Sequence, residues 1–199
     1  MTLLVLWRHG QTEWNAARRI QGQTDTPLSA VGVEQAAESA PRLAALRPTV
    51  LVSSDLQRAS TTAGALAAIT GLTPAYDPRL RERGFGEWEG LTHPEATTRW
   101  PEAFARWRRG EEVDDAGVEE IDAVAKRMAA AIQETADAAG PGAVIVVATH
   151  GAAARFATVA LLGWPLLYAP MLGALHNCHR THLRHDPVRG WMLDAHNLP

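Results

Sequence analysis

The stretch that decides the fold is AVIVVATHG, residues 143–151. Its first seven residues are a continuous apolar run rich in β-branched side chains, which is typical of a strand buried on both faces. Turn residues precede the run, a helical pattern follows it directly, and the polar pair His150-Gly151 lies at the junction. A buried strand that leads straight into a helix indicates an α/β fold with a mostly parallel sheet.

Outward from this stretch, short apolar runs alternate with helical patterns. Three more apolar runs predict strands at residues 2–7, 49–52 and 72–76. The helical patterns cover residues 29–46, 55–70, 94–109 and 118–139. Ser29 is the expected N-cap of the first helix, Gly71 ends the second, and Trp100-Pro101 interrupts the third. Pro187 and Gly190 predict the turn of a hairpin over residues 175–193.

The composition limits the class of protein. With 199 residues, 46% of them hydrophobic, the chain is long enough for one domain with its own core. The formal net charge of −3 argues against broad nucleic-acid binding. A single cysteine, Cys178, excludes an intramolecular disulfide framework and indicates a reducing compartment, so we expect a cytoplasmic protein. The sequence does not fix the oligomeric state and is compatible with a homodimer.

Residues 156–175 carry no charge over a length that would span a bilayer. Gly163, Pro165, Pro170 and Gly173 interrupt this stretch. Such breakers favour a buried helix, a loop and a strand, so we expect no membrane partner.

Polar residues follow three of the predicted strands where each strand ends. Arg8 and His9 follow the first, a Ser53-Ser54-Asp55 segment with Arg58 one turn further follows the second, and His150 follows the fourth. Ligands of open parallel sheets bind outside the carboxyl ends of the strands, so these side chains are expected to meet. Two arginines and two histidines together suit an oxyanion, phosphate in particular, and amides at helix starts would add donors.

A histidine at the centre of a phosphate site indicates a covalent mechanism. Neutral imidazole is a good nucleophile at pH 7, and its attack on phosphorus gives a phosphohistidine. The leaving oxygen then needs a proton, which the carboxylates of RERGFGEWEG, residues 81–90, can supply. Glu82, Glu87 and Glu89 are rivals for this role, and packing of one of them among Phe85 and Trp88 would raise its pKa.

Four segments together resemble the signatures of the histidine phosphatase superfamily, the phosphoglycerate mutase-like group. They occur in family order across nearly the whole chain: LVLWRHGQTEWN with RRIQGQTDTPLS at residues 4–15 and 18–29, SSDLQRASTTA at 53–63, LRERGFGEWEG at 80–90 and VATHG at 147–151. One departure lies at residues 116–119, which read AGVE where family members often carry Gly-Gly-Glu-Ser. Substrate contacts inferred for that segment do not carry over.

The resemblance implies a role for nine residues. His9 would be the phosphorylated nucleophile and Glu82 the proton donor. The transferring phosphoryl group would be bound by Arg8, Arg58 and His150, with further family positions near the phosphate at Asn15, Gln21, Gly22 and Gly151. The resemblance implies no cofactor and no metal, because the cationic side chains take the place of Mg²⁺. The implied fold is a three-layer α/β/α sandwich, a single domain over residues 1–199 with 91–117 as a short helical cap.

Three functions are compatible with these residues. The leading hypothesis is a metal-independent phosphomonoesterase acting on a small phosphorylated metabolite. A cofactor-dependent phosphoglycerate mutase is the second, although a short cap and a short tail favour water as the acceptor. A non-catalytic phospho-ligand binding module is the third. Segments such as QGQTDTPLS, SSDLQRA and GLTHPEA are similar to those of actinobacterial glucosyl-3-phosphoglycerate phosphatases. Sugar phosphates, phosphoglycerates and nucleotides all remain candidate substrates.

Other polar clusters invite competing interpretations. His176, His179, His182 and His185 recur at intervals of three, but on a strand they would alternate between faces, so we expect no metal site there. Trp100 and Trp107 with Arg106, Arg108 and Arg109 fit either a substrate mouth or an ordinary amphipathic helix. His93 and His196 are expected at the surface.

Overall fold

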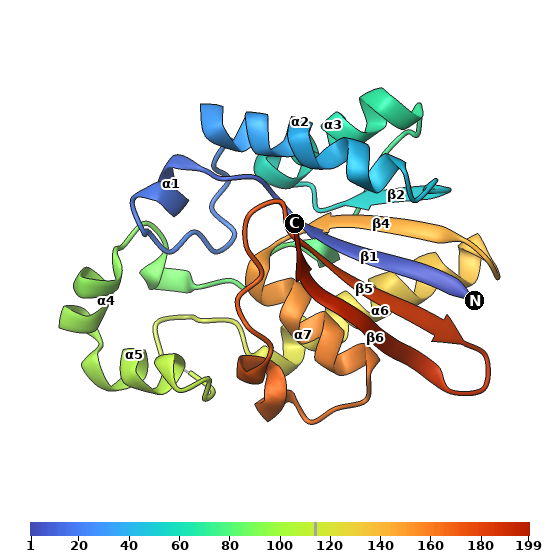
Figure 1. Ribbon diagram of the computed structural model, residues 1–199. Helices are drawn as coiled ribbons and strands as arrows, with labels where there is room; N and C mark the ends of the chain where they lie inside the picture. The colour runs from blue at the N-terminus through green and yellow to red at the C-terminus, as the bar shows by residue number, and fades with distance from the viewer. Residues whose placement is uncertain (114) are drawn as a thin grey trace.

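A six-stranded sheet forms the centre of the computed structural model, which describes residues 1–113 and 115–199 (Figure 1). Residue 114, part of the predicted cap, lies outside the described residues. The strand order is β3-β2-β4-β1-β5-β6. The strands are β1 (Thr2–Arg8), β2 (Val50–Ser53), β3 (Ala75–Tyr76), β4 (Val144–Thr149), β5 (Arg180–Asp186) and β6 (Gly190–Leu198). Strands β3, β2, β4 and β1 pair in parallel, whereas β5 runs antiparallel to β1 and to β6.

The two central strands are apolar on both faces because helices cover both. Leu4 and Leu6 of β1 join the apolar cluster made with the helices α6 (Ile121–Ala139) and α7 (Gly151–Leu161). Val5 and Trp7 point the other way, into the cluster made with α2 (Ala30–Ala44) and α3 (Gln57–Thr70). All four side chains are fully buried. The predicted three-layer α/β/α sandwich with a mostly parallel sheet is therefore confirmed, with α2 and α3 on one face and α6 and α7 on the other (Figure 1).

The expected helix caps are present. The Ser29 side chain accepts a hydrogen bond from the backbone N–H of Gly32 at the start of α2. Gly71, with φ of 73°, ends α3 in the left-handed conformation that glycine adopts without a Cβ penalty. Strands β5 and β6 form the predicted C-terminal hairpin, with Gly190 at its turn.

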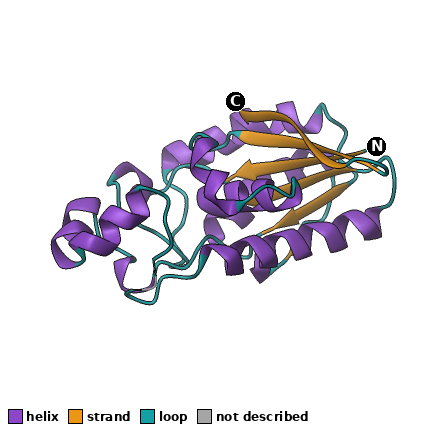
Figure 2. Cartoon of the chain, turned by 90° about the horizontal axis from the view of Figure 1, so that it is seen from below, coloured by secondary structure: helices purple, strands orange, loops and turns teal. Residues whose placement is uncertain are grey.

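A third apolar cluster lies beyond the carboxyl ends of the strands. It packs around the 3₁₀ turn η2 (Gly86–Trp88) and the helices α4 (His93–Arg99) and α5 (Pro101–Arg108). The fully buried Trp88 has its ring 5.5 Å from that of Phe104 and 6.1 Å from that of Trp107. Figure 2 shows these helices projecting from one end of the α/β layers. The short helix α1 (Glu13–Ala16) connects to this region from β1.

Several boundaries differ from those that the sequence predicts. Strand β3 has two residues instead of the five at 72–76. Helix α6 begins at Ile121, not at 118, because residue 119 bonds to Gly84 through its backbone N–H and its carboxylate. After α7 the chain forms a 3₁₀ turn, η3 (Leu166–Met171), and no strand begins before β5. The remaining element is η1 (Pro78–Leu80). Among the described residues, no helix is long and apolar enough to span a membrane.

Candidate active site

The carboxyl ends of β1, β4 and β2 bring the predicted site residues together. The backbone N–H of His9 donates to the Thr149 carbonyl at 2.9 Å, and that of Ser54 donates to Ala148 at 2.9 Å. The residues that follow the three strands are consequently neighbours. The ring centroids of His9 and His150 lie 5.1 Å apart.

The imidazole of His9 is held in the tautomer that a nucleophile needs. Its Nδ1–H donates to the carbonyl of Gly10 at 2.7 Å, which leaves the lone pair on Nε2. Its own carbonyl accepts hydrogen bonds from the Asn177 side chain and the Cys178 N–H, so the backbone is fixed as well. Burial, followed by the positive charges of Arg58 and Arg8, holds the pKa of His9 well below its usual value. The ring is therefore neutral at pH 7.

Arg58 is fully buried and organises the surrounding loop. Its Nε donates to Nδ1 of His150 at 3.2 Å, and its two terminal nitrogens donate to the carbonyls of Thr24 and Gly22. The Nε2–H of His150 then donates to the Ser54 hydroxyl at 2.9 Å. Burial lowers the pKa of Arg58 to about 10, so its charge persists at pH 7. Burial and that charge together lower the pKa of His150 well below its usual value.

Arg8 presents an unused donor beside the start of α7. One terminal nitrogen donates to the Leu175 carbonyl at 2.6 Å, but the buried Nε has no partner among the described residues. A Cβ at Gly151 would lie 3.4 Å from this Nε. A buried guanidinium N–H without an acceptor is costly unless a ligand supplies one, and an oxyanion is the acceptor that suits it.

Asn15 and Gln21 also turn donors toward the same space. The Asn15 carbonyl oxygen accepts from the Thr12 N–H, and the Gln21 carbonyl oxygen accepts from the Thr26 hydroxyl at 2.8 Å. Both residues line the inner cavity, and among the described residues their NH₂ groups have no hydrogen-bond acceptor. Gly22, between them and Arg58, has φ of 53°, and a Cβ there would lie 2.0 Å from a carboxylate oxygen of Glu89. The loop therefore needs glycine at this position.

Glu82 lies at the N-terminus of α7, in an environment that differs from the predicted one. Its carboxylate accepts hydrogen bonds from the N–H groups of Ala153 at 2.8 Å and Ala152 at 3.1 Å. The sequence led us to expect one of the three carboxylates, Glu82, Glu87 or Glu89, to pack among Phe85 and Trp88, but Trp88 belongs to the apolar cluster of α4 and α5.

The two rival carboxylates have other surroundings. Glu87 is exposed. Glu89 accepts from the backbone of Gln23, Thr24 and Phe85. Of the three, only Glu82 lines the cavity beside His9.

This inner cavity has a volume of about 210 Å³. Eight of the nine predicted site residues line it: Arg8, His9, Asn15, Gln21, Gly22, Arg58, Glu82 and Gly151. The exception is His150, which is fully buried and bonded to Arg58 and Ser54. The structure therefore places eight of them around one space and His150 directly behind it.

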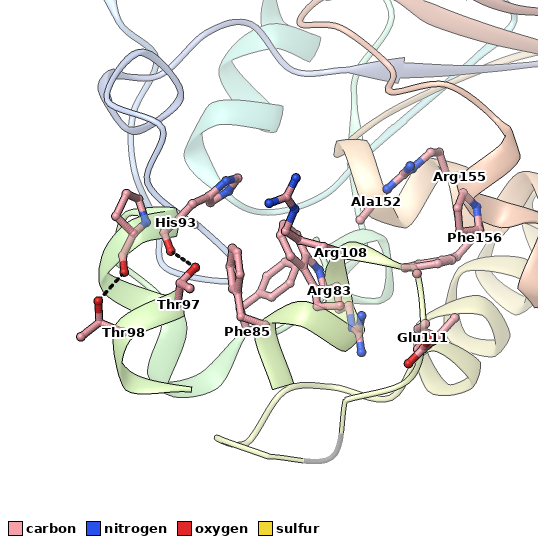
Figure 3. Close-up of a pocket in the computed structure, with 16 residues that line it drawn as sticks. Arg83, Phe85, His93, Thr97, Thr98, Arg108, Glu111, Ala152, Arg155 and Phe156 are labelled. Carbon is pink, nitrogen blue, oxygen red and sulfur yellow. Dashed lines mark hydrogen bonds between the residues drawn. The ribbon is translucent and has the colours of Figure 1, made fainter. Parts of the chain in front are cut away.

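A larger chamber of about 860 Å³ adjoins the inner cavity, and the two share Phe85, His93, Trp107, Ala152 and Arg155. Figure 3 shows the chamber between α4, which carries His93, and α7, which carries Arg155. Trp107 and Arg108 line it, as the predicted substrate mouth requires. The other three residues of that prediction do not: Arg109 pairs with Glu111, Arg106 pairs with Asp115, and Trp100 packs toward Trp88.

Two lining residues were missed. His93 was expected at the surface, and although it is exposed, its ring packs 5.4 Å from those of Phe104 and Trp107 on the chamber wall. Arg155 carried no prediction. The sequence could have indicated its position. Ala152 and Arg155 are three residues apart, so they share one face of the helix that begins at the site.

The histidines of the C-terminal segment lie away from this space. His182 and His185 are in β5, and the rings of His176 and His179 are 5.1 Å apart before that strand begins. Over residues 1–113 and 115–199, no three His, Cys, Asp or Glu side chains are grouped so that they could hold a metal ion.

Comparison with known proteins agrees with this geometry. Residues 4–198 match the family model of the histidine phosphatase superfamily (branch 1). The glucosyl-3-phosphoglycerate phosphatase of Mycolicibacterium vanbaalenii is 40% identical over 98% of this chain and 93% of the relative. A probable phosphoglycerate mutase of Yersinia pestis is 34% identical over 98% of this chain and 92% of its own.

A solved structure resembles the fold over its full length. The mycobacterial glucosyl-3-phosphoglycerate phosphatase in complex with VO₃ superposes with a TM-score of 0.90 and 37% identity, covering 99% of both chains. The prediction of a phosphatase from the four signatures is confirmed. The chain belongs to the histidine phosphatase superfamily.

Proposed function

We propose that this phosphatase is a metal-independent phosphomonoesterase that works through a phosphohistidine at His9. The observation that carries the proposal is the position of a neutral, buried imidazole with its Nε2 lone pair free, beside the guanidinium of Arg8 and that of Arg58. The inner cavity thus combines a nucleophile with the positive charge that a phosphoryl dianion requires.

In the first step, Nε2 of His9 attacks phosphorus and the bond from phosphorus to the ester oxygen breaks. Glu82, which enters this step in its protonated form, gives its proton to that oxygen, and the alcohol leaves. The free Nε of Arg8 and the NH₂ groups of Asn15 and Gln21 stabilise the charge on the phosphoryl oxygens.

In the second step, water attacks the phosphohistidine. The Glu82 carboxylate takes a proton from this water, inorganic phosphate forms and His9 regains its lone pair.

Arg58 and His150 support this chemistry through their charge and their contacts. Arg58 donates hydrogen bonds to Gly22, Thr24 and His150. It therefore fixes the backbone at Gly22 and Thr24 while it adds positive charge. Direct contact of either residue with the phosphoryl group stays a prediction. In this proposal the cationic side chains carry the role that Mg²⁺ has in other phosphoryl transfers.

The proposed substrate is a small phosphorylated metabolite, with glucosyl-3-phosphoglycerate as the first candidate and other sugar phosphates or phosphoglycerates next. The named activity of the mycobacterial relatives supports this choice. The chamber of about 860 Å³ adjoining the inner cavity supports it further, because it leaves room for a leaving group as large as a sugar. We also propose that residues 1–199 act as one domain, with 91–117 as a cap over the site.

The experiment that tests the mechanism is trapping of a phosphoenzyme that is stable in alkali and labile in acid, as a phosphohistidine is. Wild type, mixed with ³²P-labelled phosphomonoester and quenched in alkali, should retain label that acid removes. His9→Ala should retain none and lose several powers of ten in turnover while its circular dichroism stays native. Activity should survive EDTA. Label retained by His9→Ala, or activity lost to EDTA and restored by Zn²⁺ or Mg²⁺, contradicts the mechanism. An unlabelled wild type without turnover would favour a binding module.

A mutase is the second candidate, because the Yersinia relative is named as a probable one. With 3-phosphoglycerate and a 2,3-bisphosphoglycerate primer, phosphate release should outpace formation of 2-phosphoglycerate. The open chamber beside the inner cavity gives water a route to the phosphohistidine. Faster formation of the isomer would reverse this ranking.

A further inference from the structure

Arg155 lies on the wall between the two cavities and lines both of them. It projects from α7, and its side chain is neither fully buried nor fully exposed. Among the described residues its guanidinium has no hydrogen-bond or ion-pair partner. Neighbouring arginines differ in this respect: Arg83 pairs with Glu112, and Arg127 pairs with Glu119. Arg155 is thus a cation with its donors unused, placed where a bound molecule would pass.

Glu82 is the acidic group that acts on Arg155, and it does not neutralise Arg155 by contact. Both carboxylate oxygens of Glu82 are occupied by N–H groups of α7. Burial lowers the pKa of Arg155, although a guanidinium stays charged at any pH of interest. A partly desolvated guanidinium gains more from an incoming anion than one that is fully in water.

The surroundings of Arg155 select the kind of anion. Ala152, Phe156 and Phe85 are among the apolar residues that line the chamber with it. Arg83 and Arg108 also line the chamber, but among the described residues Arg155 is the one arginine that lines both cavities. A group held at the boundary between them therefore meets a single guanidinium fork, which can satisfy a single charge. A carboxylate fits that description, since its two oxygens match two parallel N–H groups. The donors for a dianionic phosphoryl group are gathered around His9 instead.

We propose that Arg155 binds a carboxylate on the leaving group, so that the preferred substrates are phosphomonoesters of hydroxy acids. The inference rests on the proposed function, because it places the phosphoryl group against His9. The ester oxygen then points from the inner cavity toward the chamber, and a carboxylate on the leaving group meets Arg155 at the boundary. Arg155 is in this view a specificity-determining residue and takes no part in proton or phosphoryl transfer.

The test compares two esters that differ only in the acidic group. These are 3-phosphoglycerate and glycerol 3-phosphate, in which a hydroxymethyl group replaces the carboxylate. For wild type, kcat/KM should be about 10–100-fold higher for 3-phosphoglycerate, the range that a charge-assisted hydrogen-bonded pair supports. Arg155→Met should bring this ratio close to one. Arg155→Lys, which keeps the charge without the fork, should give an intermediate ratio.

Arg184→Met is the matched control, because Arg184 pairs with Asp194 and neither residue lines either cavity. Its ratio should equal that of wild type. A wild-type ratio near one, or a ratio that Arg155→Met leaves unchanged, overturns the inference. Hydrolysis of p-nitrophenyl phosphate and trapping of the phosphohistidine test the proposed function separately, so that function can stand when the inference fails. A second pair of esters tests for a phosphate site instead. The inference is also overturned if the ratio of kcat/KM for fructose 1,6-bisphosphate to that for fructose 6-phosphate depends on Arg155 and exceeds the ratio for 3-phosphoglycerate to glycerol 3-phosphate. If wild type hydrolyses none of these esters, the proposed function fails and the inference fails with it.

Discussion

Glu82 combines the proposed proton transfer with the capping of a helix. The residue before α7, His150, gives that helix no side-chain cap, and the Glu82 carboxylate binds the N–H groups of Ala152 and Ala153 in its place. A negative charge at this end of a helix also interacts favourably with the helix dipole. The position of the Glu82 carboxyl group is therefore coupled to the contacts that hold the first turn of α7.

The first prediction concerns proton donation by this residue. Glu82→Gln keeps the size and one acceptor oxygen but cannot donate a proton at neutral pH. It should lower turnover of a sugar or glycerate phosphate by about 10²–10⁴-fold and that of p-nitrophenyl phosphate by less, because p-nitrophenolate leaves without protonation. Some loss should remain for the activated ester, since water must still be deprotonated. Steady-state kinetics with both esters measures the difference.

Glu87→Gln is the control for this prediction, because Glu87 is exposed. It should affect neither ester. Glu89→Gln should weaken both equally, since the Glu89 carboxylate holds the backbone at Gln23 and Thr24. If the dependence on the leaving group appears at Glu87 or Glu89 and not at Glu82, the proton donor is misassigned.

At the scale of elements, helix α6 positions the segment that carries Glu82. Arg127 of α6 donates to the carbonyls of Arg79, Arg81 and Glu82, each at 2.7–2.8 Å. Glu119, just before the helix, accepts from the same guanidinium and from the Gly84 N–H. One side chain thus fixes the backbone on both sides of the proposed proton donor.

Arg127→Met should therefore impair both stability and chemistry. Three carbonyls and a carboxylate lose their donor, and leaving buried acceptors unpaired costs about 1–3 kcal/mol of unfolding free energy. Because Glu82 is less well placed, kcat should fall for substrates with poor leaving groups more than for p-nitrophenyl phosphate. Urea titration and paired kinetics measure the two effects. Arg127→Lys, which keeps charge without the fork, should recover part of the stability and less of the kcat. Equal loss on both esters would mean that Arg127 supports the fold alone.

The same scale shows which features the sequence can predict. Strands β1 and β4 and the positions of Arg8, His9 and His150 follow from local patterns, because a continuous apolar run and the residues after it define both the strand and the candidate site. The partners of Glu82 do not, since the N–H groups of α7 lie some 70 positions along the chain. Asp55 was expected to begin a helix, but it bonds to Arg81 and α3 starts at Gln57. Such long-range contacts also explain why Arg155 on the chamber wall was missed.

At the scale of the whole molecule, two buried neutral histidines make stability depend on pH. The pKa values of His9 and His150 lie well below 6.5 in the folded protein, and unfolding returns both to about 6.5. As the pH falls below 6.5, the unfolded chain binds protons that the folded protein does not. The free energy of unfolding should fall by about 1.4 kcal/mol per pH unit for each histidine.

Urea unfolding at pH 7.5, 6.5 and 5.5 tests this prediction. Stability should be greatest at pH 7.5 and should decline between pH 6.5 and 5.5. In His9→Asn, the free energy of unfolding should fall less steeply with falling pH than in wild type, by about 1.4 kcal/mol per pH unit, because one titrating histidine has been removed. An identical slope in wild type and His9→Asn would show that His9 does not contribute. Carboxylates with lowered pKa values, such as Asp55 and Glu119, act only at lower pH, so they do not enter this range.

The pairing of β1 has a consequence for biosynthesis. Leu3 pairs with Val144 on one side and with Arg184 on the other, so the first strand to leave the ribosome lacks both neighbours until most of the chain has been made. At roughly 5–20 residues per second, the delay before Val144 is made lasts about 7–28 s. During translation β2 is made before β4, the strand that will lie between β2 and β1 in the sheet. Because His9 and His150 follow β1 and β4, the joining of these two strands is also the event that brings the two histidines of the candidate site together. A nascent chain that stops before residue 144 would expose the apolar strand and hold no active site.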